Sequence, residues 1–253
     1  MMRTILAAVV IGFAAPALAA GDTATPPAQK WSFNGPFGTF DRAELQRGYQ
    51  VYKEVCAACH AMKYVAFRNL ADPGGPGFTA AEVKALAATF EVTDGPNDAG
   101  DMFKRAALPS DKFPSPFANE KAARASNGGA YPLDLSLIAK ARVNGPDYLK
   151  ALLTGYTAAP AGFALGEGLH YNAYFPGNQI AMPQPLNADQ VTYADGTKAT
   201  VEQMAHDVSA FLMWTAEPKL EERKRMGFKV MIFLVVLTGL FFMAKKRIWA
   251  KLH

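Results

Sequence analysis

The sequence has little cysteine and little histidine, with two cysteines and four histidines in 253 residues. Two cysteines are too few for the disulfide framework that stabilises a small secreted domain with a poor core. Half of the residues are hydrophobic, which is too much apolar material for a disordered chain or a collagen-like fibre. The composition therefore predicts a globular domain with its own core.

The central part of the chain, residues 21–220, also lacks a net positive charge. The whole sequence has a formal charge of +4, from 26 basic and 22 acidic residues. Nine of the basic and two of the acidic residues lie within residues 1–20 and 221–253, which leaves 17 basic against 20 acidic residues, a charge of −3, for residues 21–220. Binding to nucleic acid depends on a basic surface, so this distribution argues against a nucleic-acid partner.

Residues 1–20 have the composition of a signal peptide. Arg3 precedes an apolar run that extends through Ala15, and the segment ends in the small residues Ala17-Leu18-Ala19-Ala20. The alternative, an N-terminal membrane helix, would need about 20 apolar residues, more than this run provides. We therefore predict cleavage after Ala19 or Ala20 and export of the rest of the chain.

A second apolar run, close to the C-terminus, has no polar face. We predict that residues 221–253 form a membrane anchor and a short tail, with the span at about residues 226–244, because a spanning helix needs about 20 apolar residues. Lys245, Lys246 and Arg247 follow the span, whereas the basic residues before it are partly offset by glutamates. The positive-inside rule then places the C-terminus in the cytoplasm and residues 21–220 in the periplasm of a bacterial inner membrane.

Capping motifs and apolar periodicity predict a mainly α domain with long loops over residues 21–220. Asp41 and Glu44 are spaced as a capping box ahead of a helix from Arg42 toward Val55. Similar boxes precede two further helices, and another short helix is expected to have a proline at its first position. These signals are Thr79 with Glu82, Thr200 with Gln203, and Pro146. The segment 191–198, which contains Asp195-Gly196, has the pattern of a small hairpin.

Both cysteines belong to one motif, Cys56-Ala57-Ala58-Cys59-His60. The C-x-x-C-H spacing is typical of covalent haem attachment, in which the two thiols form thioethers with the vinyl groups and the adjacent imidazole binds the iron. At the end of a helix the two sulfur atoms lie about one turn apart. The motif predicts one haem c bound through Cys56 and Cys59, with His60 as an axial ligand of the iron.

Three alternative roles for the motif have less support. A thioredoxin-like redox pair needs a βαβ context that the sequence lacks, and a zinc site needs two more cysteine or histidine ligands nearby. A disulfide between Cys56 and Cys59 would leave His60 without a role. Export to an oxidising compartment is compatible with haem attachment.

The second axial ligand determines the chemistry of the haem. Methionine or a second histidine indicates electron transfer at higher or lower potential, and an open position indicates ligand or peroxide chemistry. The residues favour Met182, which lies in an irregular loop stiffened by Pro176, Pro183 and Pro185. His253 lies beyond the anchor and is excluded by topology. The remaining candidates stay open at this point: Met102, Met204, Met213, His170 and His206.

Several segments resemble the cytochrome c1 family, whose members are the haem subunits of cytochrome bc1 complexes. They are Gly48 to Val55 before the haem motif, the loop from Tyr174 to Leu186, and Asp207 to Trp214 with Glu217-Pro218 ahead of a single anchor. The resemblance covers nearly the whole exported chain, with the motifs in the same order and spacing. It implies a cytochrome c-type helical haem domain with long loops and one C-terminal transmembrane helix.

The resemblance also implies a set of haem contacts. Met182 would be the sixth ligand of the iron, and Arg142 and Tyr148 match an arginine and a tyrosine that face the haem propionates. Further pocket positions are implied at Asn127, Pro132, Ile138, Leu152, Leu153, Phe175 and Ile180. Some bacterial relatives carry an extra disulfide, for which this chain has no cysteines left.

In a family-like mechanism the chain would be a one-electron carrier of the respiratory chain and would make or break no substrate bond itself. It would take electrons from the Rieske iron–sulfur protein, in a complex with cytochrome b, and pass them to a soluble c-type cytochrome. Glu82, Asp94, Asp98 and Asp101 are candidate carboxylates for docking that basic partner. The alternatives are a free membrane-anchored cytochrome c that donates to an oxidase, and a haem enzyme with an open sixth position.

Overall fold

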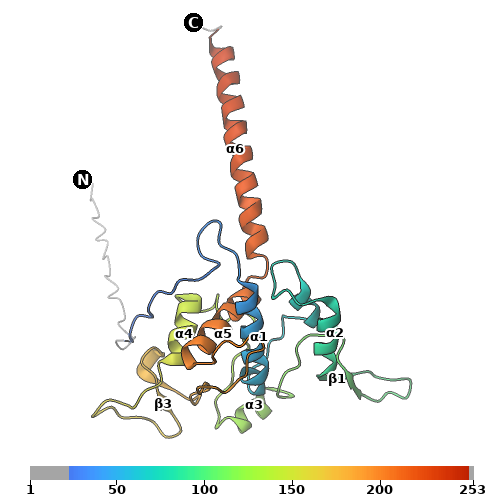
Figure 1. Cartoon of the computed structure of the whole chain (residues 1–253), viewed down its shortest axis with the longest axis vertical. Coiled ribbons are helices and arrows are strands. Elements are labelled where there is room, and N and C mark those ends of the chain that lie inside the picture. Colours follow the sequence, from blue (N-terminus) through green and yellow to red (C-terminus); the bar gives the residue numbers. More distant parts are fainter. Residues whose placement is uncertain (1–22, 251–253) are drawn as a thin grey trace, which may run out of the picture.

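A computed structural model describes residues 23–250 as a mainly helical domain at the foot of one long helix (Figure 1). The predicted signal peptide therefore lies outside the described residues. The helices are α1 (Arg42–Glu54), α2 (Ala80–Ala88), α3 (Glu120–Ser126), α4 (Gly145–Thr154), α5 (Val201–Ala216) and α6 (Leu220–Trp249), with short 3-10 helices at Cys56–Ala58, Phe67–Ala71 and Pro176–Asn178. Strand β1 (Glu91–Asp94) pairs with β2 (Phe103–Ala106), and β3 (His170–Tyr171) pairs with β4 (Gln179–Ile180), both antiparallel. The prediction of a mainly α domain with a C-terminal apolar helix is confirmed.

The predicted helix starts are close to the observed ones, but some capping side chains have other partners. Thr79 and Glu82 form a complete capping box. Asp41 accepts hydrogen bonds from the first amides of α1, yet the Glu44 carboxylate does not return to the Asp41 amide, which donates to Ser32 Oγ instead. Glu44 lies 2.8 Å from the imidazole of His206 on α5, so a tertiary contact replaces the local one. Pro146 is the second residue of α4, not the first.

The hairpin predicted at residues 191–198 is wrong. The segment contains a turn with Gly196 at φ 76° but no strand. The Asp195 carboxylate instead accepts hydrogen bonds from Arg47 and from the Thr197 amide. The longer hairpin forms at β1–β2, whose residues are exposed or half-buried. Each strand has only four residues, and Val92 is the one side chain of β1 that packs against the core, so the stretch is too short for an alternating pattern to stand out in the sequence.

Helices α1 and α5 pack together at the centre of the domain (Figure 1). Gly48 lies where their backbones come close. A Cβ atom at Gly48 would lie 2.1 Å from the Asp207 carbonyl oxygen and 2.6 Å from the Phe211 Cβ. Around the crossing, the aromatic rings of Tyr49, Tyr52 and Phe211 are buried against one another and the neighbouring loops. Glycine therefore allows the two helices to pack backbone against backbone.

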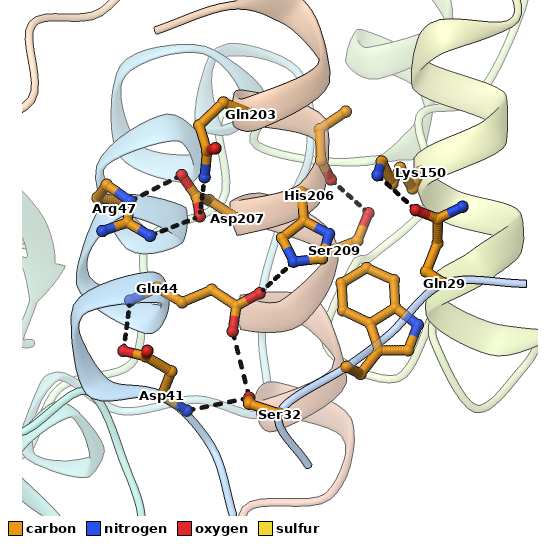
Figure 2. Close-up of polar contacts among 12 residues, drawn as sticks. Gln29, Ser32, Asp41, Glu44, Arg47, Lys150, Gln203, His206, Asp207 and Ser209 are labelled. Carbon is orange, nitrogen blue, oxygen red and sulfur yellow. Dashed lines mark hydrogen bonds and ion pairs between the residues drawn. The ribbon is translucent and has the colours of Figure 1, made fainter. Parts of the chain in front are cut away.

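A polar network covers one side of this crossing (Figure 2). Arg47 on α1 donates to both carboxylate oxygens of the fully buried Asp207 on α5, at 2.9 and 3.1 Å. Burial raises the pKa of Asp207, whereas the hydrogen bonds from Arg47 and Gln203 act to lower it. His206 stacks on the Trp31 ring with centroids 4.4 Å apart. These contacts fix the segment before α1 and both central helices in one arrangement.

Helix α6 begins inside the domain and leaves it without a break. Leu220 is buried in the core, and the Glu221 carboxylate accepts hydrogen bonds from the Phe40 amide at 3.0 Å and from Arg42 at 2.9 Å. Farther along, the helix contains an 18-residue window of mean hydropathy 2.2 with no buried residue. The helix is long and apolar enough to cross a membrane, and its first turn is part of the domain.

Candidate haem site

The C-x-x-C-H motif lies directly after α1, in a tight turn around one carbonyl group. The amides of Cys59 and His60 both donate to the Cys56 carbonyl, at 3.1 and 2.9 Å. The Val55 amide still donates to the Val51 carbonyl, so α1 continues directly into this turn, and the small side chains of Ala57 and Ala58 let the turn close tightly. The two thiols and the imidazole are thereby held on one compact turn, as covalent attachment of a single haem edge requires.

The imidazole of His60 is oriented for metal binding. Its Nδ1 lies 2.7 Å from the Leu133 carbonyl oxygen. A carbonyl can only accept, so Nδ1 carries the proton and Nε2 keeps its lone pair for a metal ion. Burial lowers the pKa of His60, which favours the neutral imidazole that binds iron. This donor set fits a haem iron.

The thiols do not have the properties of a redox pair. Cys56 and Cys59 are both free thiols. Burial raises the pKa of Cys56 to about 12, and the neighbouring Cys59 adds to the shift. A redox-active C-x-x-C motif needs a lowered thiol pKa. Residues 23–250 also contain no group of three or more histidine, cysteine, aspartate or glutamate side chains that could hold a metal ion, so the zinc alternative gains no support.

A short loop after α3 holds the far side of the imidazole in place. The Leu135 amide donates to the Ala61 carbonyl at 2.8 Å, and the Asp134 carboxylate accepts hydrogen bonds from the amides of Lys63 and Ser136. The loop is therefore joined to the residues directly after His60, which places the Leu133 carbonyl opposite Nδ1. Its role could not be found from the sequence, because a backbone carbonyl leaves no signal in the residue types.

Met182 lies half-buried in the loop after β4, and the hydroxyl of Tyr156 donates to its carbonyl at 3.0 Å. The segment before β4, which leads to this loop, is held by Asn172, which is fully buried. The Asn172 side chain donates to the Leu152 carbonyl at 2.8 Å and accepts from the amides of Tyr174 and Phe175 at 3.0 and 3.2 Å. One amide side chain thus joins the end of α4 to the segment that leads to Met182. Asn172 is a positioning residue that no sequence motif indicated.

Replacement of Asn172 by alanine is expected to loosen this loop. Two amides and one carbonyl would lose their buried partner, at a cost of about 2 kcal/mol or more in the free energy of unfolding. Denaturant unfolding followed by haem absorption measures this loss, and carbon monoxide binding to the ferrous protein reports the freedom of the Met182 side. The exposed Asn187→Ala is the matched control. Equal stability of the two variants would contradict the role of Asn172.

Arg142 and Tyr148 lie close enough to influence each other. Tyr148 is half-buried, and burial raises its pKa while the positive charge of Arg142 acts in the opposite direction. Arg142 is exposed, and its guanidinium donates to the neighbouring Ala141 carbonyl at 3.1 Å. Within the described residues it forms no ion pair, so its charge is available to an anion such as a propionate.

The other predicted pocket residues lie in different surroundings. Ile138 is buried in the core, with Leu153 and Cys56 packed against the same cluster, and Ile180 is buried in β4. Pro132 and Cys59 line a common surface pocket of about 160 Å³. Leu152 and Phe175 both contact the Asn172 side chain through their backbone groups.

Asn127 differs from these residues, because its side-chain amide group donates to the Ala123 carbonyl at the end of α3.

The alternative axial ligands occupy other places. Met204 is fully buried on α5 as part of the core, and His206 is held between Glu44 and Trp31 (Figure 2). Met102 is 60% exposed beside β2, and His170 is exposed on β3. Met213 is half-buried on α5 and packs against the core. Among these candidates, Met182 combines partial burial with an irregular loop that adjoins the residues of the predicted pocket.

The fold and the site together define a class of protein. The molecule is a helical domain with the C-x-x-C-H motif at the end of its first helix, and one apolar C-terminal helix extends from this domain. These features define a single-pass membrane-anchored c-type cytochrome with one covalent haem c. Residues 31–252 match the family model described as "Cytochrome C1 family", and the chain belongs to this family.

Individual relatives agree with this membership. The chain is 55% identical over 247 residues to "Cytochrome b/c1" of Bradyrhizobium diazoefficiens, an alignment that covers 90% of this chain and 36% of the relative. It is 50% identical to cytochrome c1 of Rhodospirillum rubrum, covering 87% of this chain and 86% of the relative. It is 55% identical to the mitochondrial cytochrome c1 1 heme protein of Arabidopsis thaliana, covering 84% and 68%. The chain thus spans about a third of the length of the Bradyrhizobium protein.

Proposed function

We propose that the chain is the one-electron carrier of a quinol:cytochrome c reductase of the bc1 type. It accepts an electron from a Rieske iron–sulfur subunit and passes it to a soluble c-type cytochrome. The observation that carries the proposal is the neutral, oriented imidazole of His60 at the end of α1, in a chain that matches the cytochrome c1 family over residues 31–252. The haem, when bound, supplies reversible one-electron reduction of its iron.

The residues proposed to hold the haem have separate tasks. Cys56 and Cys59 would attach it through thioether bonds, and His60 and Met182 would bind its iron. Arg142 and Tyr148 would contact the propionates, and the apolar side chains among the remaining pocket positions would exclude water from the iron and so raise the reduction potential. The remaining pocket positions are Asn127, Pro132, Ile138, Leu152, Leu153, Phe175 and Ile180, all apolar except Asn127.

The proposed topology has a signal peptide over residues 1–20, a periplasmic haem domain over 21–220 and an anchor over 221–253. The basic cluster after the span supports a cytoplasmic C-terminus of a protein in the bacterial inner membrane. Cytochrome b is the proposed neighbour of α6 within the bilayer, and the name "Cytochrome b/c1" of the Bradyrhizobium relative supports this association.

The proposed docking carboxylates are not equivalent. Glu82 is engaged in the capping box with Thr79, whose amide and hydroxyl groups lower the pKa of Glu82. Asp94 pairs with Arg105, which likewise lowers its pKa. Asp98 and Asp101 are exposed in the loop between β1 and β2. We propose that this loop and Glu82, whose carboxylate stays ionised, offer the negative charge that guides a basic cytochrome, whereas the charge of Asp94 is offset by Arg105.

Purification in mild detergent tests the proposal against the free-cytochrome alternative. A pyridine haemochrome spectrum of the purified material reports c-type and b-type haem together. We expect both haems and an iron–sulfur subunit in one preparation. A chain that migrates alone, with haem c only, would contradict the bc1 proposal and favour a free membrane-anchored cytochrome.

Replacement of Arg142 by alanine is expected to lower the haem reduction potential by a few tens of millivolts. A cation beside the propionates offsets their negative charge, and its removal stabilises the ferric state, which carries the greater positive charge. Potentiometric titration measures the shift. Arg142→Lys keeps the charge and should restore most of the potential. An unchanged potential and unchanged haem retention in Arg142→Ala would remove the propionate assignment.

A further inference from the structure

The segment before α1 is rich in aromatic residues and has no charge. Residues 31–40 include Trp31, Phe33, Phe37 and Phe40 and contain no acidic or basic residue. Trp31, Phe33 and Phe40 are at most 6% exposed. Phe37 is 78% exposed, at the tip of the segment. A single exposed ring is normal on a protein surface, whereas an exposed ring that continues a larger apolar surface marks contact with an apolar partner.

The tip is built as a tight loop, so the position of Phe37 is defined. The Asn34 amide donates to the Trp31 carbonyl and the Thr39 amide to the Ser32 carbonyl, both at 3.1 Å. Gly35 has a positive φ of 72°. A Cβ atom at Gly38 would lie 2.0 Å from the Asn34 carbonyl oxygen, so the chain returns on itself at this point.

The loop is attached to the first turns of α6. Lys224 on α6 donates to the Phe33 carbonyl at 2.6 Å and to the Gly38 carbonyl at 3.0 Å, one on each side of the tip. The Phe37 ring meets the ring of Phe228 edge to face, with centroids 6.0 Å apart. Figure 1 shows the loop, in blue, rising from the domain beside the base of α6. Phe37 is thus held at the level of Phe228.

Phe228 lies where α6 becomes apolar. It is 56% exposed, and the exposed apolar side chains Val230, Met231 and Ile232 follow after the single charged residue Lys229. We propose that residues 34–38 are a second membrane contact, in which Phe37 enters the lipid at the boundary between headgroups and acyl chains. The apolar surface of α6 continues onto Phe37, and residues 34–38 have no charged side chain of their own. The nearby Lys224 and Lys229 have stems long enough to keep their charges in the headgroup region. Two contacts at one level, on a helix whose first turn belongs to the domain, fix the tilt of the haem domain on the membrane. This inference rests on α6 as a membrane span and not on the electron-transfer role.

A fluorescent label at position 37 tests the contact. Both native cysteines are consumed by the haem, so Phe37→Cys offers a free thiol for an environment-sensitive fluorophore. The haem-loaded full chain, with the subunits that copurify, is reconstituted in phosphatidylcholine vesicles. Quenching by lipids that carry a nitroxide high on the acyl chain is compared with quenching by aqueous iodide. For the label at position 37 we expect quenching by the nitroxide lipids several-fold stronger than for a label on the far side of the domain, and weak quenching by iodide.

The control is Ser126→Cys, an exposed position on α3 at the end of the domain remote from α6 (Figure 1). Iodide quenching at position 37 equal to that at position 126 would overturn the proposal. A label shielded from both quenchers would also overturn it, because a protein subunit would then cover Phe37. Pro36→Cys, at the neighbouring exposed position, supplies the same measurement should Phe37→Cys not be recovered with haem.

Discussion

Met182→Leu is expected to lower the reduction potential of the haem by about 0.2 V, a fraction of the roughly 0.8 V range that axial ligands span. A thioether is a soft ligand that favours ferrous iron, and a leucine of similar volume removes the sulfur while it keeps the packing. The position that Met182 occupied would open to water in the ferric state and to carbon monoxide in the ferrous state. Potentiometric titration and the carbon monoxide difference spectrum measure the two effects.

Met213→Leu is the matched control for this change, because Met213 is also half-buried but lies on α5 and packs against the core. It should leave both the potential and the resistance to carbon monoxide unchanged. A Met182→Leu protein that behaves in the same way would show that another side chain is the sixth ligand. The exposed His170 on β3, in the same part of the chain, would then be the next residue to replace.

The part of the site that could be predicted from the sequence is the part that depends on local chemistry. The C-x-x-C-H motif is contiguous, so its five residues carry the attachment site without help from the fold. The helix that leads into it could be predicted from Asp41, which caps α1 as expected. The order of the motifs indicated the cytochrome c1 resemblance, and the family match over residues 31–252 confirms it.

The supporting contacts could not be predicted, because they join residues far apart in the chain. The Leu133 carbonyl reaches His60 across 73 positions, and it is a backbone group with no residue preference. Asn172 looks like any loop asparagine until the structure places its amide on α4 and on the Met182 loop. Glu44 is the opposite case, in which a local signal pointed to the wrong partner. Its spacing predicted a capping box, yet its carboxylate contacts His206 and Ser32 instead. Tertiary partners decide where such side chains point.

Gly48→Ala is expected to destabilise the domain by about 3 kcal/mol, at the upper end of the usual cost of overpacking. The added Cβ would lie 2.1 Å from the Asp207 carbonyl oxygen, and neither backbone can yield unless α1 and α5 separate. The separation would also strain the ion pair between Arg47 and the buried Asp207. Because the haem motif follows α1 directly, a displaced α1 moves Cys56 relative to the rest of the pocket. Denaturant unfolding followed by haem absorption measures the loss, and the yield of covalent haem reports assembly.

The same substitution elsewhere separates crowding from helix propensity. Alanine is favoured over glycine in a helix interior by about 1 kcal/mol, so a glycine without close neighbours should tolerate the change or gain stability. Gly227, within α6, has no atom within 4 Å of its hypothetical Cβ, and Gly227→Ala is therefore the control. Opposite signs for the two variants would assign the loss to the α1–α5 contact. Equal stabilities of the Gly48→Ala and Gly227→Ala proteins would mean that α1 can move to make room for a methyl group without loss of packing. The close contact between α1 and α5 would then not be what positions the haem motif.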